Sequence, residues 1–132
     1  MACCNSTVTW ECCNPDVCTC DGCCCQNTNC QQPCSDLNPT CGFGACCTCN
    51  TNSWGFAWKT SCPCSICVSC GGFLYFNQTA NPCNLLWLAA RVDTHNPAAA
   101  SIADFTKAFF TQFAPLSQGV INMRVSNDAT CC

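Results

Sequence analysis

Cysteine is the residue whose chemistry dominates this sequence, with 22 thiols in 132 residues. A cysteine content this high is typical of small scaffolds held by disulfides. The even count of 22 allows eleven bridges, although their pairing cannot be deduced from the sequence. Because such bridges persist only in oxidising compartments, we expect a secreted, extracellular protein.

Clustered thiolates that bind soft metals are the alternative use of these cysteines. Cys18-Thr19-Cys20 followed by Cys23-Cys24-Cys25 has a spacing that suits such a cluster. A thiolate cluster needs cations to balance its charge, and this chain has four Lys and Arg residues in total. We therefore predict disulfides, with no bound metal and no cofactor.

Adjacent cysteines occur near both ends of the chain. Neighbouring cysteines rarely bridge each other because the geometry is strained, so each usually reaches a different partner. Cys3, Cys4, Cys131 and Cys132 are therefore candidates for disulfides between molecules. The alternative is that these residues staple the termini to the body of the same molecule.

The remaining polar residues limit the enzyme classes that are available. His95 is the only histidine, which excludes most histidine-based metal sites and leaves Ser and Cys nucleophiles without a second base. Because Asn96-Pro97 follows it, we expect His95 to be an exposed loop residue. Seven carboxylates remain for acid and base chemistry: Glu11, Asp16, Asp21, Asp36, Asp93, Asp104 and Asp128.

Aromatic side chains offer a second kind of site, because they can stack on sugar rings. We take Trp54, Trp58 and Tyr75 as candidates for sugar binding, and Trp54, beside Asn52 and Ser53, as the exposed one. Aromatic residues on strands are more often part of the core, and that alternative stays open for all three.

The charge of the chain bears on its partners and location. A net charge of −3 does not suit a nucleic-acid backbone, and so small a charge permits self-association into a homo-oligomer or polymer. No apolar run reaches membrane-spanning length. Asn5-Ser6-Thr7 and Asn77-Gln78-Thr79 are glycosylation sequons and agree with secretion. Met1 to Cys4 has no features of a signal peptide, so we expect numbering from a processed start.

The elements that position these residues lie mostly in the second half. Residues 7–10, 55–59, 73–76, 85–90 and 120–125 read as strands, and Phe105, Ala108, Phe109 and Phe113 have helical spacing. We expect Asp104 or Thr106 to cap this helix and Pro115 to end it. Residues 1–40 have few large apolar side chains, so we predict a disulfide-stapled, loop-rich arm before a domain at 41–132.

The segment 41–132 resembles the double-psi β-barrel of the barwin, expansin and RlpA-like proteins. The matching pieces, in the family's order, are Cys41-Gly42, Cys70-Gly71-Gly72-Phe73-Leu74-Tyr75-Phe76, Asn81-Pro82-Cys83-Asn84, Ala90-Arg91-Val92-Asp93-Thr94, Ile102-Ala103-Asp104-Phe105-Thr106 with Ala108-Phe109, and Gly119-Val120-Ile121. The resemblance implies a mainly β fold, a closed six-stranded barrel with one short helix. Several members of the family bind polysaccharide in a groove.

A second similarity bears on catalysis. Residues 9–15, Thr-Trp-Glu-Cys-Cys-Asn-Pro, resemble the opening of family 45 endoglucanases, with Glu11 in place of a catalytic aspartate. The barrel resemblance places Asp93 at a groove aspartate. Glycoside hydrolysis needs two carboxylates, so Asp93 and Glu11 are the catalytic candidates. Ala103-Asp104-Phe105 stands where expansins and these endoglucanases carry His-Phe-Asp, and its histidine is absent.

Three functions are compatible with the sequence. The first is a non-catalytic structural protein that self-assembles into an extracellular coat or filament. The second is an expansin-like module that binds polysaccharide or cell wall. The third is a glycan-cleaving enzyme that uses Asp93. The small number of charges, the terminal cysteine pairs and the absence of His-Phe-Asp support the first. We favour it over the second because the catalytic geometry is incomplete and the sequence does not place the binding aromatics.

Overall fold

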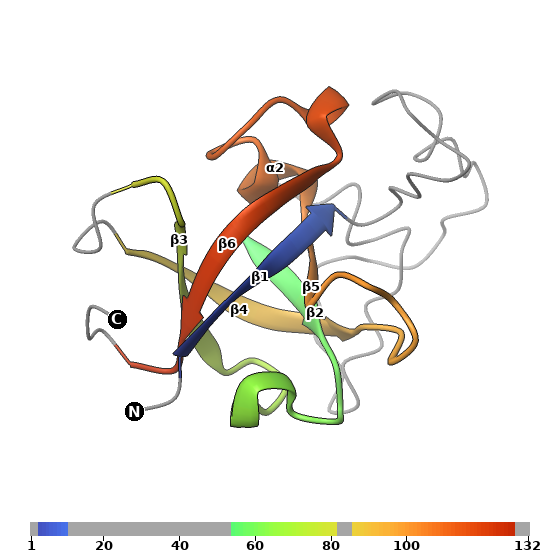
Figure 1. Ribbon diagram of the computed structural model, residues 1–132. Coiled ribbons are helices and arrows are strands. Elements are labelled where there is room, and N and C mark those ends of the chain that lie inside the picture. Colours follow the sequence, from blue (N-terminus) through green and yellow to red (C-terminus); the bar gives the residue numbers. More distant parts are fainter. Residues whose placement is uncertain (1–2, 11–53, 82–85, 129–132) are drawn as a thin grey trace.

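A computed structural model describes residues 3–10, 54–81 and 86–128 of the chain. Within these ranges six strands form a closed β-barrel (Figure 1). The strands are β1 (Cys3–Trp10), β2 (Gly55–Trp58), β3 (Phe73–Gln78), β4 (Trp87–Thr94), β5 (Ala103–Phe105) and β6 (Val120–Ser126). The helix α2 (Lys107–Phe110) lies at one end of the barrel, and short 3₁₀ turns occupy Pro63–Ser65 and Leu116–Gln118.

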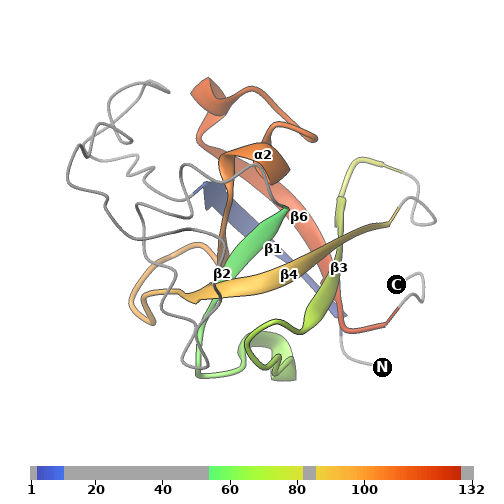
Figure 2. The same ribbon diagram turned by 180° about the vertical axis from the view of Figure 1, so that it is seen from behind.

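The barrel mixes parallel and antiparallel pairing, in the order β1-β5-β2-β4-β3-β6. The pairs β1–β5 and β2–β4 are parallel, and the other four pairs are antiparallel. The view from behind shows β2 and β4 side by side (Figure 2). This arrangement confirms the mainly β prediction with one short helix, and it is compatible with a double-psi barrel. Across the described ranges, no helix has the length and apolar character needed to span a membrane.

The first strand comes from the segment predicted to be a separate arm. β1 pairs with β6 from Cys3↔Ser126 to Thr9↔Val120 and with β5 from Val8↔Ala103 to Trp10↔Phe105. It therefore closes the barrel, and the predicted boundary between residues 40 and 41 does not follow the strands. Residues 11–53, which contain most of the predicted arm, lie outside the described ranges.

Aromatic side chains fill the barrel. Phe76 lies 5.0 Å from Phe56 and 4.8 Å from Phe105, and Phe105 lies 4.6 Å from Phe109, measured between ring centroids. All four rings are fully buried, and each burial of this size contributes about 2–3 kcal/mol. The core thus joins β2, β3 and β5 to α2.

The helix begins where the sequence predicts but is shorter. The Thr106 side chain accepts a hydrogen bond from Phe109 N at 3.2 Å, which confirms Thr106 as the cap. Asp104 and Phe105 lie on β5 instead, where Phe105 pairs with Phe56. Helical spacing at Phe105 therefore reflects a buried strand position followed by a single helical turn.

Two disulfides brace one end of the barrel. Cys4 is bonded to Cys64, which lies 60 residues away, and Cys62 is bonded to Cys67. The candidate role of Cys4 in a bond between molecules is therefore wrong, because its sulfur is used within the chain. Cys70 is also disulfide-bonded. These bonds agree with the disulfide prediction, while Cys18 to Cys25 lie outside the described residues.

Candidate functional site

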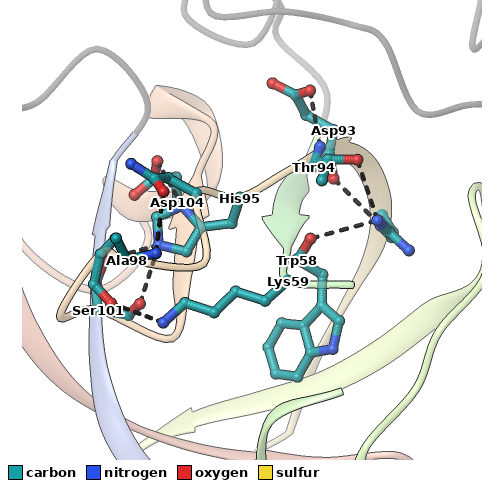
Figure 3. A network of polar contacts seen from close by, with 11 residues as sticks. Trp58, Lys59, Asp93, Thr94, His95, Ala98, Ser101 and Asp104 are labelled. Carbon is teal, nitrogen blue, oxygen red and sulfur yellow. Dashed lines mark hydrogen bonds and ion pairs between the residues drawn. The ribbon is translucent and has the colours of Figure 1, made fainter. Parts of the chain in front are cut away.

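A buried histidine connects β4 to β5. His95, directly after β4, is only 4% exposed, and its Nδ1 lies 3.1 Å from Oδ2 of Asp104. Its backbone N–H donates to the carbonyl oxygen of Trp58 at 3.0 Å. Figure 3 shows His95 against Asp104 and Ser101, with Asp93 apart from them. The prediction of an exposed loop histidine is therefore wrong, because the ring turns back into the barrel wall.

The other nitrogen of the imidazole contacts Ser101. Nε2 lies 3.0 Å from the backbone carbonyl oxygen of Ser101 and 3.1 Å from its Oγ. With its hydrogen on Nδ1, the ring donates to Asp104 and accepts from the Ser101 hydroxyl; with its hydrogen on Nε2, the ring donates to Ser101. In each case the imidazole links Ser101 to the Asp104 carboxyl group, which is 19% exposed.

The loop that closes over the imidazole is fixed from both sides. Lys59 Nζ donates to the carbonyl oxygen of Ala99 at 2.7 Å. Ala98 N donates to Asn96 Oδ1 at 3.0 Å, and Ile102 N donates to the carbonyl oxygen of Thr7 at 2.8 Å. These contacts hold the segment between β4 and β5 against β1 and β2.

Two aspartates face the same residue of β2 from opposite sides. Ala57 is the register partner of Asp93 on β4 and of Asp104 on β5, and Asp104 is in turn the partner of Thr9 on β1. Neighbouring strands lie about 4.8 Å apart, so the backbones at Asp93 and Asp104 are about 10 Å apart. We refer to Thr9, Asp104, Ala57 and Asp93 as the carboxylate row.

Hydrogen-bond acceptors in this row lack partners. Oδ1 of Asp104 and Oγ1 of Thr9 are buried and have no hydrogen bond within the described part of the chain. Such groups in a folded protein call for an explanation, and a bound ligand or water is one. Asp93 differs, because its Oδ1 accepts a hydrogen bond from Thr94 N at 2.8 Å, as expected for an aspartate at a strand end.

Arg91 fixes the end of β4 that carries Asp93. Its guanidinium donates to the carbonyl oxygens of Val68 at 2.7 Å, Asp93 at 3.2 Å and Trp58 at 3.3 Å. Burial lowers the pKa of Arg91, and the nearby Asp93 carboxylate acts in the opposite direction. The Arg91 side chain thus links the ends of β2 and β4 to the segment before β3.

The predicted sugar-binding aromatic residues have different environments. Trp54 is 39% exposed, as predicted, and its ring centroid lies 5.3 Å from that of Trp87. Trp58 is fully buried and donates its indole N–H to the carbonyl oxygen of Ile66 at 2.9 Å. A ring enclosed in the core cannot stack on a sugar, so Trp58 does not fit that role. Tyr75 is half-buried and is the register partner of Leu88 on β4.

The two predicted glycosylation sites differ in burial. Asn5 is exposed on β1, whereas Asn77 on β3 is fully buried and offers no accessible amide for glycosylation in the folded state. Glu11, Cys131 and Cys132 lie outside the described residues, and Cys3 lies at the start of β1. The structure therefore does not place Glu11 beside Asp93.

The sequence reasoning missed the pairing of His95 with Asp104. Their contact depends on β2 lying between β4 and β5, which is a long-range feature that spacing along the chain does not encode. The signal that was available is the order Asp93, His95, Ser101, Asp104 within one short connection. Comparison of the chain with protein-family models and with curated proteins found no match.

Proposed function

We propose that this chain is a secreted, disulfide-stabilised barrel of the barwin, expansin and RlpA-like kind that binds polysaccharide at the carboxylate row. The observation that carries the proposal is the placement of Asp93 and Asp104 on either side of Ala57. Carboxylate oxygens accept hydrogen bonds from sugar hydroxyls, and the Asp93 and Asp104 side chains are both partly exposed.

Polysaccharide retention tests this proposal. The protein is incubated with cellulose, chitin and peptidoglycan, and the bound fraction is compared for the parent protein, Asp93→Asn and Asp104→Asn. A hydrogen bond to a charged group contributes about 1.5–3 kcal/mol, so each variant should bind roughly ten- to a hundredfold more weakly. Asp128→Asn is the matched control, since Asp128 follows β6, away from the row. Equal retention of all four proteins would refute the proposal.

Glycan cleavage is tested on the same face. Glycoside hydrolysis needs two carboxyl groups, and the candidates are Asp104, beside His95, and Asp93. Release of reducing sugar by the parent protein, lost in Asp93→Asn, would extend binding to catalysis. No release by the parent protein would limit the role to binding.

Self-assembly into a coat or filament is a second candidate, favoured by an apolar outer face. Phe73 on β3 is 58% exposed and Leu88 on β4 is 42% exposed, and their register partners Ala90 and Tyr75 lie beside them. We infer that a second copy of this chain covers this face. The low charge of the chain, −3 with few charged residues, would oppose such contact only weakly.

Microscopy and sedimentation distinguish this candidate from polysaccharide binding. Negative-stain microscopy of the parent protein should show assemblies, and Phe73→Ser combined with Leu88→Ser should sediment as a monomer. Val120→Ser is the matched control, because Val120 is 40% exposed on β6. Gels run with and without reductant show whether disulfides also link the copies. A monomeric parent protein would exclude assembly.

A further inference from the structure

A polar hollow lies on a different wall of the barrel from the carboxylate row. It has a volume of about 410 Å³ and is lined by Asn5, Ser6 and Thr7 of β1, Asn122 of β6 and Thr79 after β3. This volume is within the range of small-ligand sites. Since β6 lies between β1 and β3, the hollow belongs to the β1–β6–β3 wall, whereas Ala57 and Asp93 belong to β2 and β4.

Strand register explains why the polar side chains gather there. Thr7 is the partner of Asn122, and Asn5 is the partner of Arg124, so these four residues share one face of the β1–β6 pair. Asn5 and Asn122 are exposed, while their neighbours Val8 and Ile121 are buried on the other face. Because polar and apolar residues alternate along β1 and β6, most of the polar lining of the hollow comes from one face of this pair.

The lining has the chemistry of a site for a hydroxylated ligand. Carboxamides and hydroxyls both donate and accept hydrogen bonds, which suits sugar hydroxyls that do the same. The five lining residues include no carboxylate and no aromatic ring. An anionic ligand would therefore not be repelled by the lining of the hollow, whereas the aspartates of the carboxylate row would repel it.

Arg124 adds a cation at the edge of this site. Its Nη2 donates to the carbonyl oxygen of Thr79, a lining residue, at 3.4 Å. Its Nη1 is buried and makes no hydrogen bond within the described ranges. A charged donor without an acceptor is costly to bury, so a shift of the Arg124 side chain toward an anionic oxygen bound in the hollow would be favoured.

We propose that the hollow binds a sugar that carries a carboxylate. The carboxylate pairs with Arg124, and the ring hydroxyls bond to the amides and hydroxyls of Asn5, Thr7 and Asn122. This site is independent of the carboxylate row, which would repel such a ligand. A barrel with both sites could engage two kinds of sugar unit, one neutral and one acidic.

The test is an NMR titration of isotope-labelled full-length protein, made in a host without N-glycosylation so that Asn5 is free. D-Galacturonate and D-galactose are the two probes. Amide shifts should concentrate at residues 5–7, 79 and 122–124, and galacturonate should bind about tenfold more tightly than galactose, as one charge-assisted hydrogen bond would give. Absence of galacturonate binding, shifts elsewhere, or equal affinity for the two probes would overturn the proposal.

Variants separate this site from the polysaccharide site. Asn122→Trp fills the hollow at an exposed position and should abolish galacturonate binding while the thermal unfolding midpoint stays near that of the parent. Arg124→Gln should reduce galacturonate affinity to the level of galactose. Asp93→Asn should leave the titration unchanged. Unaltered binding in Asn122→Trp would contradict the site, whatever the outcome of the polysaccharide assay.

Discussion

Nδ1 of His95 and Oδ2 of Asp104 lie 3.1 Å apart, although His95 follows β4 and Asp104 lies on β5, two strands that do not pair with each other. β2 lies between those strands, and the chain from residue 96 to 102 carries the connection around its end. The pair therefore fixes the orientation of the Asp104 carboxyl group and closes the connecting loop at the same time. The stability of this loop and the orientation of Asp104 in the carboxylate row therefore both depend on the His95 side chain.

Replacement of that imidazole should lower stability. His95→Ala removes the partner of Asp104 and the contacts to Ser101, and it leaves a cavity in a region where His95 is 4% exposed. We expect a loss of about 2–4 kcal/mol in the free energy of unfolding, measured by urea denaturation. Ser117→Ala, at an exposed position, is the control and should change stability by less than about 0.5 kcal/mol. A His95→Ala protein as stable as the parent would refute this role.

Thr106 satisfies two backbone groups with one hydroxyl. Its Oγ1 accepts hydrogen bonds from Phe109 N and from Gly55 N, each at 3.2 Å, in a fully buried position. Thr106→Ala removes this acceptor from both groups, although Phe109 N keeps its 3.1 Å hydrogen bond to the carbonyl oxygen of residue 106, and should cost about 1–3 kcal/mol. Thr106→Ser retains the oxygen and should lose less than half as much. Equal losses in the two variants, by chemical denaturation, would show that the methyl group rather than the hydroxyl matters.

The two disulfides should contribute unequally. The Cys4–Cys64 bond closes a loop of 60 residues and the Cys62–Cys67 bond a loop of 5. Loop-closure entropy then gives about 4 kcal/mol for the first and about 2 kcal/mol for the second. Each pair is replaced together by serine, and the unfolding free energies are compared. A greater loss on removal of Cys62–Cys67 would contradict the chain-entropy explanation.

A side chain at position 55 should lower the stability of the fold because β4 passes close to Gly55. A Cβ at this position would lie 2.9 Å from Cγ1 of Val92 and 3.2 Å from the carbonyl oxygen of Ala90. Gly55→Ala should cost about 1–3 kcal/mol through overpacking. If the clash with Val92 is the cause, Gly55→Ala should cost less in a Val92→Ala background. The same cost in both backgrounds would assign the effect to the backbone of Ala90 instead.

Local features of the fold could be predicted from the sequence. Apolar alternation located β6, and the aromatic run Phe73 to Phe76 located β3, because burial of one strand face leaves a period of two. Thr106 was predicted as a cap because its hydroxyl type suits that position. The role of residues 3–10 was missed in part, since only 7–10 were predicted as a strand and the segment was assigned to an arm. β1 gains its stability from pairing with β5 and β6, which lie far along the chain.

The candidate site depended on long-range features in the same way. Asp93 was singled out through the family resemblance, while Asp104 was assigned to a helix cap because its neighbours have helical spacing. The carboxylate row exists because β2 lies between β4 and β5, where Ala57 is the register partner of both aspartates. His95 was expected in solvent because Asn96-Pro97 indicates a turn. The turn exists, but it directs the ring inward.

Oligosaccharide-induced amide shifts test the central claim most directly. The labelled protein is titrated with soluble oligomers of whichever polysaccharide retains it best, and the shifted residues are mapped onto the barrel. We predict that the largest shifts fall at Ala57, Asp93, Thr94 and Asp104, and that they disappear in Asp104→Asn. Shifts confined to Phe73 and Leu88, or no shifts at saturating oligomer, would contradict a polysaccharide site at the carboxylate row.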